Sequence, residues 1–180
     1  MEENICLDCA LCCDGTIYTS APVGAADDLE PLRATGVYWM KVEDRTTFRL
    51  PCAAVAGGCC SIYDRRPSVC REVSCLLRLR FDAGLVSFDD ARSRIDDVKE
   101  LRDRIRPQLE SFFGAPGPHA IAELFKLLKV EFDGKASTLR GRPEHADLLL
   151  DVAALRLLLG RHFDPARWNA EEASRPAAGE

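Results

Sequence analysis

The chain has 180 residues, of which 47% are hydrophobic and 29% charged, a composition typical of a soluble globular protein. Its formal net charge of −5 leaves no general surplus of cations for phosphates, so we expect no nucleic-acid partner. No stretch approaches the roughly 20 apolar residues of a membrane span, and MEENICLDC lacks the basic and apolar parts of a secretory signal. We therefore expect a cytoplasmic protein with no membrane partner.

All nine cysteines lie within the first 75 residues. The reducing cytosol keeps ordinary thiols free, and a disulfide scaffold would staple the whole chain rather than its first part. The uneven distribution therefore predicts a local metal site beside a region without cysteines.

Residues 1–19 form the first predicted cysteine loop. Cys6, Cys9 and Cys12 stand three positions apart, a spacing that lets sulfurs converge on one centre and that also opens the ferredoxin ligand pattern. Cys13 follows directly. The simplest use of this vicinal pair is to serve two centres, or one cluster with a further ligand facing away.

The next segment is predicted to contain a short helix over residues 22–35, closed by Gly36. The sequence VYWMKVEDRTTFRL, residues 37–50, contains two runs rich in β-branched and aromatic side chains around EDR. This pattern predicts a small β-hairpin that leads to the second cysteine stretch.

The second cysteine stretch covers residues 52–75 and contains Cys52, Cys59, Cys60, Cys70 and Cys75. Gly57 and Gly58 predict a tight turn, and Pro67 suits the first position of a helix over residues 67–81. On an ideal helix Cys70 and Cys75 would lie about 140° apart. Either this helix is irregular, or the two thiols bind different atoms of a larger assembly.

The remaining sequence is helical in pattern. Ser87 and Asp90 resemble a capping box, and an apolar stripe with helical spacing follows. Its members are Phe88, Ala91, Ile95, Val98, Leu101, Ile105, Leu109 and Phe112. Pro107 is expected to kink or split this helix, because its ring opposes the carbonyl four residues earlier.

Two further helices are predicted, one with apolar positions between Ile121 and Leu128 and one from about Pro143 to His162. Breaks are predicted at APGPH, residues 115–119, and at GRP, residues 141–143. The last helix is apolar on most sides, so we expect it to be central.

The predicted fold is mainly α, with N-terminal cysteine-rich metal-binding loops and a small β-hairpin followed by a helical bundle. We expect a cysteine-cluster domain over 1–84, a helical region packing on it over 85–165, and a flexible tail over 166–180.

The run CLDCALCC, the distal Cys52 and the block CSIYDRRPSVCR resemble the CxxCxxCC cysteine-cluster family, also called the YkgJ-like zinc- or iron-chelating domain. The resemblance covers residues 6 to about 76 and assigns Cys60, not Cys59, to the motif. It implies eight metal ligands: Cys6, Cys9, Cys12, Cys13, Cys52, Cys60, Cys70 and Cys75.

Tyr63, Arg66 and Arg71 of the same block are expected to bind the cofactor. The two arginines would offset the negative charge of a thiolate site and donate to sulfur, and Tyr63 would pack over it. The alternative is that they are solvated arginines at a helix start and a tyrosine of the core.

Both an iron–sulfur cluster and zinc remain open as the cofactor. The three-cysteine run slightly favours iron–sulfur, whereas zinc would favour closed tetrahedral thiolate sites. His119, His145 and His162 lie in or beside the helical half, so we expect them to be surface or cap residues.

We expect a metal-binding protein that acts as a chelator, metal carrier or adaptor, with a protein partner docked through the helical half. A flagellin lysine-methylating protein resembles the family in its cysteine motif. That likeness implies, as an alternative, an iron–sulfur enzyme that modifies protein side chains. A thiol redox sensor is the third alternative. The sequence contains no P-loop, G-x-S-x-G or H-E-x-x-H motif.

Overall fold

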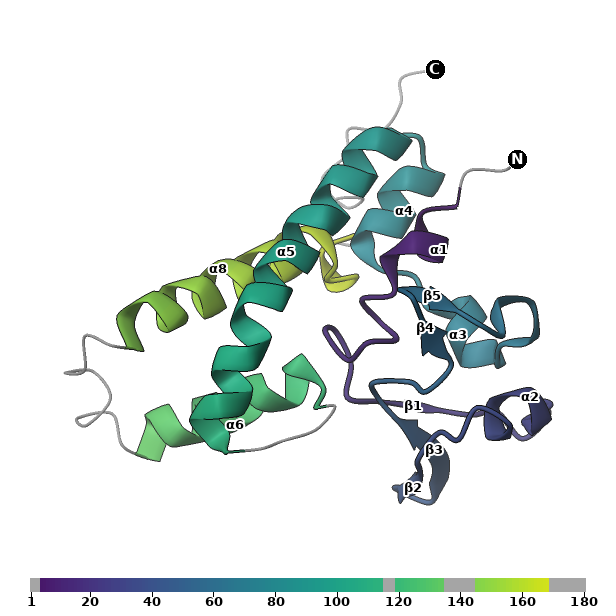
Figure 1. Ribbon diagram of the computed structural model, residues 1–180. Coiled ribbons are helices and arrows are strands. Elements are labelled where there is room, and N and C mark those ends of the chain that lie inside the picture. Colours follow the sequence, from purple (N-terminus) through teal and green to yellow (C-terminus); the bar gives the residue numbers. More distant parts are fainter. Residues whose placement is uncertain (1–3, 115–118, 135–144, 169–180) are drawn as a thin grey trace.

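Figure 1 shows the computed structural model of the chain, which describes residues 4–114, 119–134 and 145–168. Short helices and small antiparallel sheets form the N-terminal half, and the long helices lie in the C-terminal half. The prediction of a mainly α fold with a small hairpin is therefore confirmed.

The first cysteines lie on a short helix rather than in an open loop. Helix α1 spans Ile5–Cys9, and the Asn4 side chain caps it by accepting the Cys6 N–H at 3.0 Å. The helix ends at Ala10, whose positive φ of 54° turns the chain away.

A three-stranded antiparallel sheet follows, in the order β1-β3-β2. Its strands are β1 (Ser20–Pro22), β2 (Trp39–Val42) and β3 (Arg45–Arg49). The predicted hairpin is confirmed: Glu43 and Asp44 connect β2 to β3 with positive φ values of 46° and 63°. Two positive φ values in a two-residue connection are typical of a type I′ turn, whose twist matches the flanking strands.

The helix predicted over residues 22–35 is much shorter, since α2 spans only Glu30–Arg33. Pro22 pairs with Thr47 in the sheet, and the Val23 N–H donates to the Thr46 carbonyl at 2.9 Å. Residues 22 and 23 therefore pair with β3 of the sheet and do not form a helix.

The predicted turn at Gly57 and Gly58 is confirmed. Both glycines have positive φ values, 59° and 84°, and they join β4 (Val55–Ala56) to β5 (Cys59–Cys60). The 3-10 helix η1 (Tyr63–Arg65) then leads to the segment that contains Cys70 and Cys75.

The single helix predicted over residues 67–81 is wrong, because the structure contains two helices there. Helix α3 spans Ser68–Glu72 and α4 spans Leu76–Asp82. Val73 leaves helical geometry, and Cys75 starts α4 as its N-cap residue, its sulfur accepting the Arg78 N–H at 3.4 Å. A local cap thus competes with continuation of the helix.

Helix α5 (Phe88–Phe113) is continuous through Pro107, so the proline does not split the helix into two. Its axis changes direction near the middle of its length in Figure 1, as an internal proline would produce. The Ser87 hydroxyl accepts the Asp90 N–H at 3.1 Å, which confirms the predicted N-terminus. The buried side of α5 follows the predicted stripe: Ala91, Ile95, Val98, Leu101, Ile105 and Leu109.

Helices α6 (Ile121–Gly134) and α8 (Ala146–His162) complete the helical half. The prediction that the last helix is central is wrong. Leu150 and Leu157 of α8 are 68% and 73% exposed, so only one side of the helix is buried. The predicted break at 141–143, most of the break at 115–119, and nearly all of the predicted tail lie outside the described residues.

Two hydrophobic cores organise the molecule. The larger core joins α1 and α4 to the long helices and includes Ile5, Leu77 and Ile105. The smaller core lies within the sheet region and includes Leu32 and Phe48. Among the described residues, no helix has both the length and the apolar character required to traverse a bilayer.

Candidate metal centre

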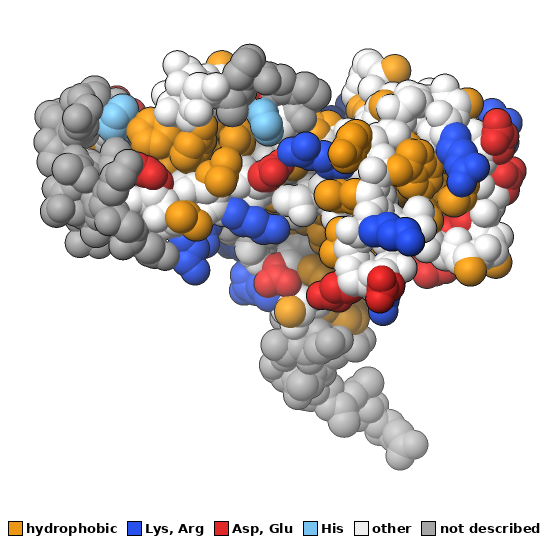
Figure 2. Space-filling view, turned by 90° about the horizontal axis from the view of Figure 1, so that it is seen from below, with side chains coloured by type: hydrophobic (Ala, Val, Ile, Leu, Met, Phe, Trp, Pro, Cys, Tyr) orange, Lys and Arg blue, Asp and Glu red, His pale blue; other side chains and the backbone are white. Residues whose placement is uncertain are grey.

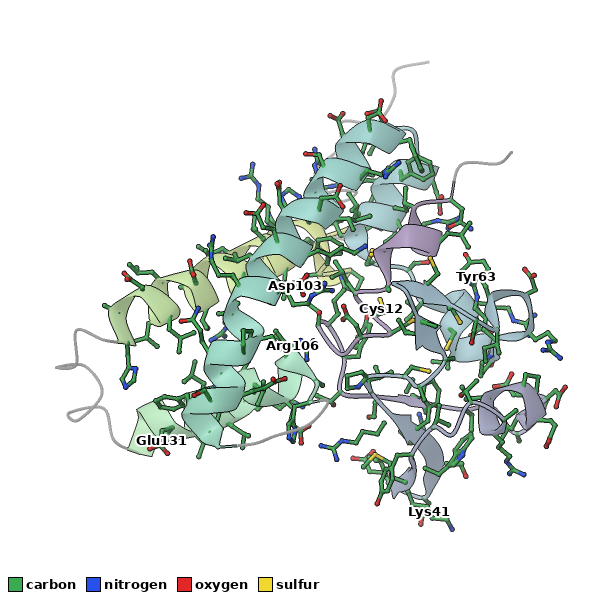
Figure 3. The ribbon with its side chains drawn as sticks, in the orientation of Figure 1. Cys12, Lys41, Tyr63, Asp103, Arg106 and Glu131 are labelled. Atoms are coloured by element: carbon green, nitrogen blue, oxygen red, sulfur yellow. The ribbon has the colours of Figure 1, made fainter. Side chains whose placement is uncertain are left out.

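Eight of the nine cysteines line one cavity of about 330 Å³. They are Cys6, Cys9, Cys12, Cys13, Cys52, Cys60, Cys70 and Cys75. The cavity wall also includes Leu11 and Phe163 of the larger core and Phe48 and Ile62 of the smaller core. The predicted ligand set therefore gathers where the two cores meet, and Figure 3 shows sulfur atoms on several sides of the labelled Cys12.

The ninth cysteine is separated from the others. Cys59 is exposed and pairs with Ala56 in the small hairpin, whereas the neighbouring Cys60 lines the cavity. Successive side chains of a strand point to opposite faces, which explains the different positions of these neighbours. All nine cysteines are free thiols, so none is withdrawn into a disulfide.

Backbone contacts bring the two cysteine segments together. The Cys52 N–H donates to the carbonyl of Cys13 at 2.8 Å, across 39 positions of sequence. Leu50 is bound in the same way, since its N–H donates to the Thr19 carbonyl at 3.0 Å. These bonds fix the loop before β4 against the turn that follows α1.

Burial in the cavity wall raises the pKa of several thiols and so favours their protonated form. It raises the pKa of Cys9 and of Cys13 to about 12, from an ordinary value of 9.0. The pKa of Cys70 rises to about 11 for the same main reason, and that of Cys12 is also raised by burial. Neighbouring sulfurs raise these pKa values further, so a bound metal must displace several protons.

Backbone N–H groups act in the opposite direction and favour the thiolate form. Burial remains the largest influence at Cys9, Cys52 and Cys75, but backbone hydrogen bonds lower the pKa of each thiol. Such bonds also stabilise sulfur atoms that carry negative charge in a metal complex.

Tyr63, Arg66 and Arg71 all line the cavity beside the thiols. The Tyr63 hydroxyl accepts from the Asn4 amide at 2.7 Å, and the Arg66 guanidinium stacks 3.6 Å from the centre of the Tyr63 ring. The Arg71 Nε donates to the Arg66 carbonyl at 2.9 Å. Contact of these three side chains with a cofactor stays a prediction.

Arg66 also provides a buried donor with no partner. Its Nε atom is fully buried and makes no hydrogen bond within the part of the chain that the structure describes. The charge of Arg66 opposes the effect of burial at Cys70 by favouring the thiolate. A donor of this kind suits a negatively charged sulfur group in the cavity.

Two cations near the thiols were not predicted from the sequence. Arg78 of α4 donates from Nη1 to the Cys6 sulfur at 3.9 Å and from Nε to the Asp82 carboxylate. Lys99 of α5 favours the thiolate of Cys9 through its charge. Arg78 follows Cys75 by one helical turn, so the sequence could have placed this arginine beside the thiol. No local pattern places Lys99 near the cysteines.

The donor set fits zinc or an iron–sulfur cluster, both of which bind thiolates. Among residues 4–114, 119–134 and 145–168, no three His, Cys, Asp or Glu side chains already stand together to hold a metal ion. The thiols line a cavity rather than form a closed mononuclear site. Loaded with metal, the eight cysteines would hold it, and it would supply Lewis-acid or electron-transfer chemistry according to its identity.

Comparison with family models finds a match over residues 5–93, to the model described as "CxxCxxCC: Putative zinc- or iron-chelating domain". The matched segment begins at α1 and ends in the second turn of α5, so it contains every cavity cysteine. Neither the curated proteins nor the solved structures include a match to the chain.

Proposed function

Residues 5–93 are a domain of the CxxCxxCC family, and we propose that the chain binds metal through its eight cavity cysteines. An iron–sulfur cluster is the preferred cofactor and zinc the alternative. The observation that carries the proposal is the gathering of eight free thiols from two sequence segments around one cavity, while the ninth stays at the surface.

The volume of the cavity supports the preference for iron–sulfur. The cavity volume of about 330 Å³ is far larger than a single metal ion requires. A cluster of iron and sulfide occupies more of such a space than single zinc ions do. It also holds its ligand sulfurs further apart, which suits thiols distributed around a cavity wall.

We propose that the protein acts as a chelator, metal carrier or adaptor in the cytoplasm. The reducing cytosol keeps thiols available for metal. Several apolar side chains of the two last helices are exposed, and hydrophobic side chains lie at the surface of the helical half in Figure 2. They support a protein partner at that half, and they include Leu127, Val130, Leu150 and Leu157. The predicted division into a cysteine domain over 1–84 and a helical region over 85–165 stays part of this proposal.

The direct test is metal and sulfide analysis of protein purified without oxygen. The expected protein is brown, absorbs at roughly 400 nm, and contains iron with acid-labile sulfide. Colourless protein with stoichiometric zinc would replace iron–sulfur by zinc and retain metal binding. Protein free of both metals, even after anaerobic addition of Zn²⁺ or of Fe²⁺ with sulfide, would contradict metal binding itself.

The alternatives predict different results in the same preparation. A side-chain-modifying enzyme would transfer a group to a protein substrate only when loaded with metal. A redox sensor would form a disulfide reversibly at the potentials of the cytosol. The metal analysis therefore comes first, because the metal content of the protein must be known before activity or disulfide formation can be interpreted.

A further inference from the structure

The cavity thiols divide according to the hydrophobic core that their side chains contact. One group packs against the larger core and contains Cys6, Cys9 and Cys75. The other packs against the smaller core and contains Cys52, Cys60 and Cys70. Each group is therefore attached to a separate packed unit.

Hydrogen bonds connect the members of the first group. Arg78 donates its backbone N–H to the Cys75 sulfur at 3.4 Å and its guanidinium to the Cys6 sulfur at 3.9 Å. Cys6 and Cys9 are three positions apart on α1, so their side chains share one face of that helix. Arg78 thus connects Cys6 to Cys75, and α1 connects Cys6 to Cys9.

The second group is connected through the β4–β5 hairpin. The Cys52 carbonyl accepts the Val55 N–H at 3.0 Å, and Val55 pairs with Cys60 in the hairpin. The Cys52 N–H in turn donates to the Cys13 carbonyl at 2.8 Å. The backbone of Cys13 is thereby joined to the second group.

The vicinal pair Cys12 and Cys13 supplies the remaining two cavity thiols. The bond from the Cys52 N–H to the Cys13 carbonyl attaches Cys13 to the second group. Cys12, three positions after Cys9, is then the fourth thiol available to the first group.

The break between α3 and α4 completes the division. Cys70 lies within α3, whereas Cys75 caps α4 after the chain has changed direction at Val73. One continuous helix would have rotated the two thiols by about 140° without separating them into different packed units.

From this geometry, and on the basis of the proposed metal binding, we propose that the cavity holds two separate four-thiolate centres. The first centre takes Cys6, Cys9, Cys12 and Cys75. The second takes Cys13, Cys52, Cys60 and Cys70. Four thiolates are the full ligand set of either a [4Fe–4S] cluster or a structural zinc ion. Arg78 and Lys99 act on thiols of the first centre and Arg66 on a thiol of the second.

Serine variants test this division through the amount of bound metal. Cys75→Ser and Cys60→Ser should each lose one centre and keep half of the metal of the unaltered protein. Adding Cys6→Ser to Cys75→Ser should cause no further loss, because both changes affect the same centre. Combining Cys75→Ser with Cys60→Ser should remove nearly all the metal. Cys59→Ser is the matched control and should keep the full amount.

A second measurement uses the unaltered protein and does not depend on the folding of variants. Anaerobically purified protein is treated briefly with a chelator, its free thiols are alkylated, and the modified cysteines are identified by mass spectrometry. The four thiols of one centre should become reactive together, while the other four stay protected.

The outcomes separate this inference from the proposed function. Unaltered protein without metal would contradict the function. Bound metal that is lost completely in every single variant would overturn only the division into two centres. Alkylation of all eight thiols together, or of a set that mixes the two groups, would also overturn the division into two centres.

Discussion

At the scale of single residues, the two neighbours Cys59 and Cys60 lie in different environments. The strand geometry of β5 directs one to solvent and the other to the cavity. A change of one position in the strand register would exchange them. The family motif already favoured Cys60, and the structure places that residue on the cavity wall, but which thiols bind metal stays a prediction.

Gly15 lies in a left-handed conformation and in close contact with the start of α6. Its φ is +79°, and a Cβ atom built there would lie 2.7 Å from both Cα and Cβ of Ala120. Its carbonyl also accepts the Ala122 N–H at 3.0 Å. Gly15→Ala should therefore lower the free energy of unfolding by roughly 3 kcal/mol, since it combines a backbone penalty with a steric clash.

The matched control is Gly36→Ala. Gly36 has a similar φ of +77°, but a Cβ atom there would meet nothing within 4 Å. The free energy of unfolding of this variant should fall by only about 1 kcal/mol, which is the cost of a left-handed backbone conformation for alanine. Urea unfolding of both variants measures the difference. Equal losses would contradict the expected clash with Ala120.

At the scale of elements, the break between α3 and α4 determines how the second cysteine segment serves the cavity. Local propensity over residues 67–81 favours one helix, but Cys75 caps a new one. The break turns α4 so that Leu76 and Leu77 enter the interior. Arg78 follows on the same helix and reaches Cys6, so one element supplies a thiol, a core contact and a cation.

Arg78 of α4 gives the prediction for this scale. Its guanidinium hydrogen-bonds the Cys6 sulfur, and its positive charge stabilises negative charge there. Because the side chain is partly exposed, Arg78→Gln should weaken metal binding by roughly fivefold, or about 1 kcal/mol. Chelator competition measures the affinity.

The conservative variant Arg78→Lys retains the charge, so it should recover most of the affinity, more at low ionic strength than at high. Equal affinities for Gln, Lys and the unaltered arginine would contradict a role for this cation. A loss of helix content in Arg78→Gln would instead point to the ion pair with Asp82.

At the scale of the whole molecule, the cavity proposed to bind metal lies between two cores that the cysteine segments connect. The larger core contains α1 and α4 together with the long helices, and the smaller core contains the sheet. Metal at this junction would cross-link the two units. Because a ligand that binds only the folded state stabilises it, removal of metal should lower stability across the molecule.

The raised thiol pKa values predict how the metal-free protein responds to pH. Folded Cys9 and Cys13 stay protonated up to about pH 12, whereas unfolded thiols lose their protons from about pH 9. The folded state therefore binds more protons between these values, and stability falls as the pH rises through this range. Each such thiol contributes about 1.4 kcal/mol per pH unit.

Urea unfolding of metal-free and metal-loaded protein at several values above pH 9 measures this effect. The loaded protein is the comparison, since its thiolates are already deprotonated and its stability should depend less on pH. Equal pH dependence of the two forms would contradict the proposed burial of protonated thiols.

The sequence by itself determined the features that depend on short-range geometry. The stripe of α5, its Ser87 cap, the β2–β3 hairpin and the turn at Gly57 each follow from the spacing of neighbouring residues. The resemblance to the family followed likewise from cysteine spacing, which a linear motif records directly.

Only the tertiary structure decided which surfaces those elements bury and which residues meet. It shortened α2 by pairing residues 20–22 with β3, exposed one side of α8, and brought Arg78 and Lys99 to the thiols. It also gathered eight cysteines around one cavity. Contacts between distant segments depend on how whole elements pack, and spacing along the chain carries no information about that packing.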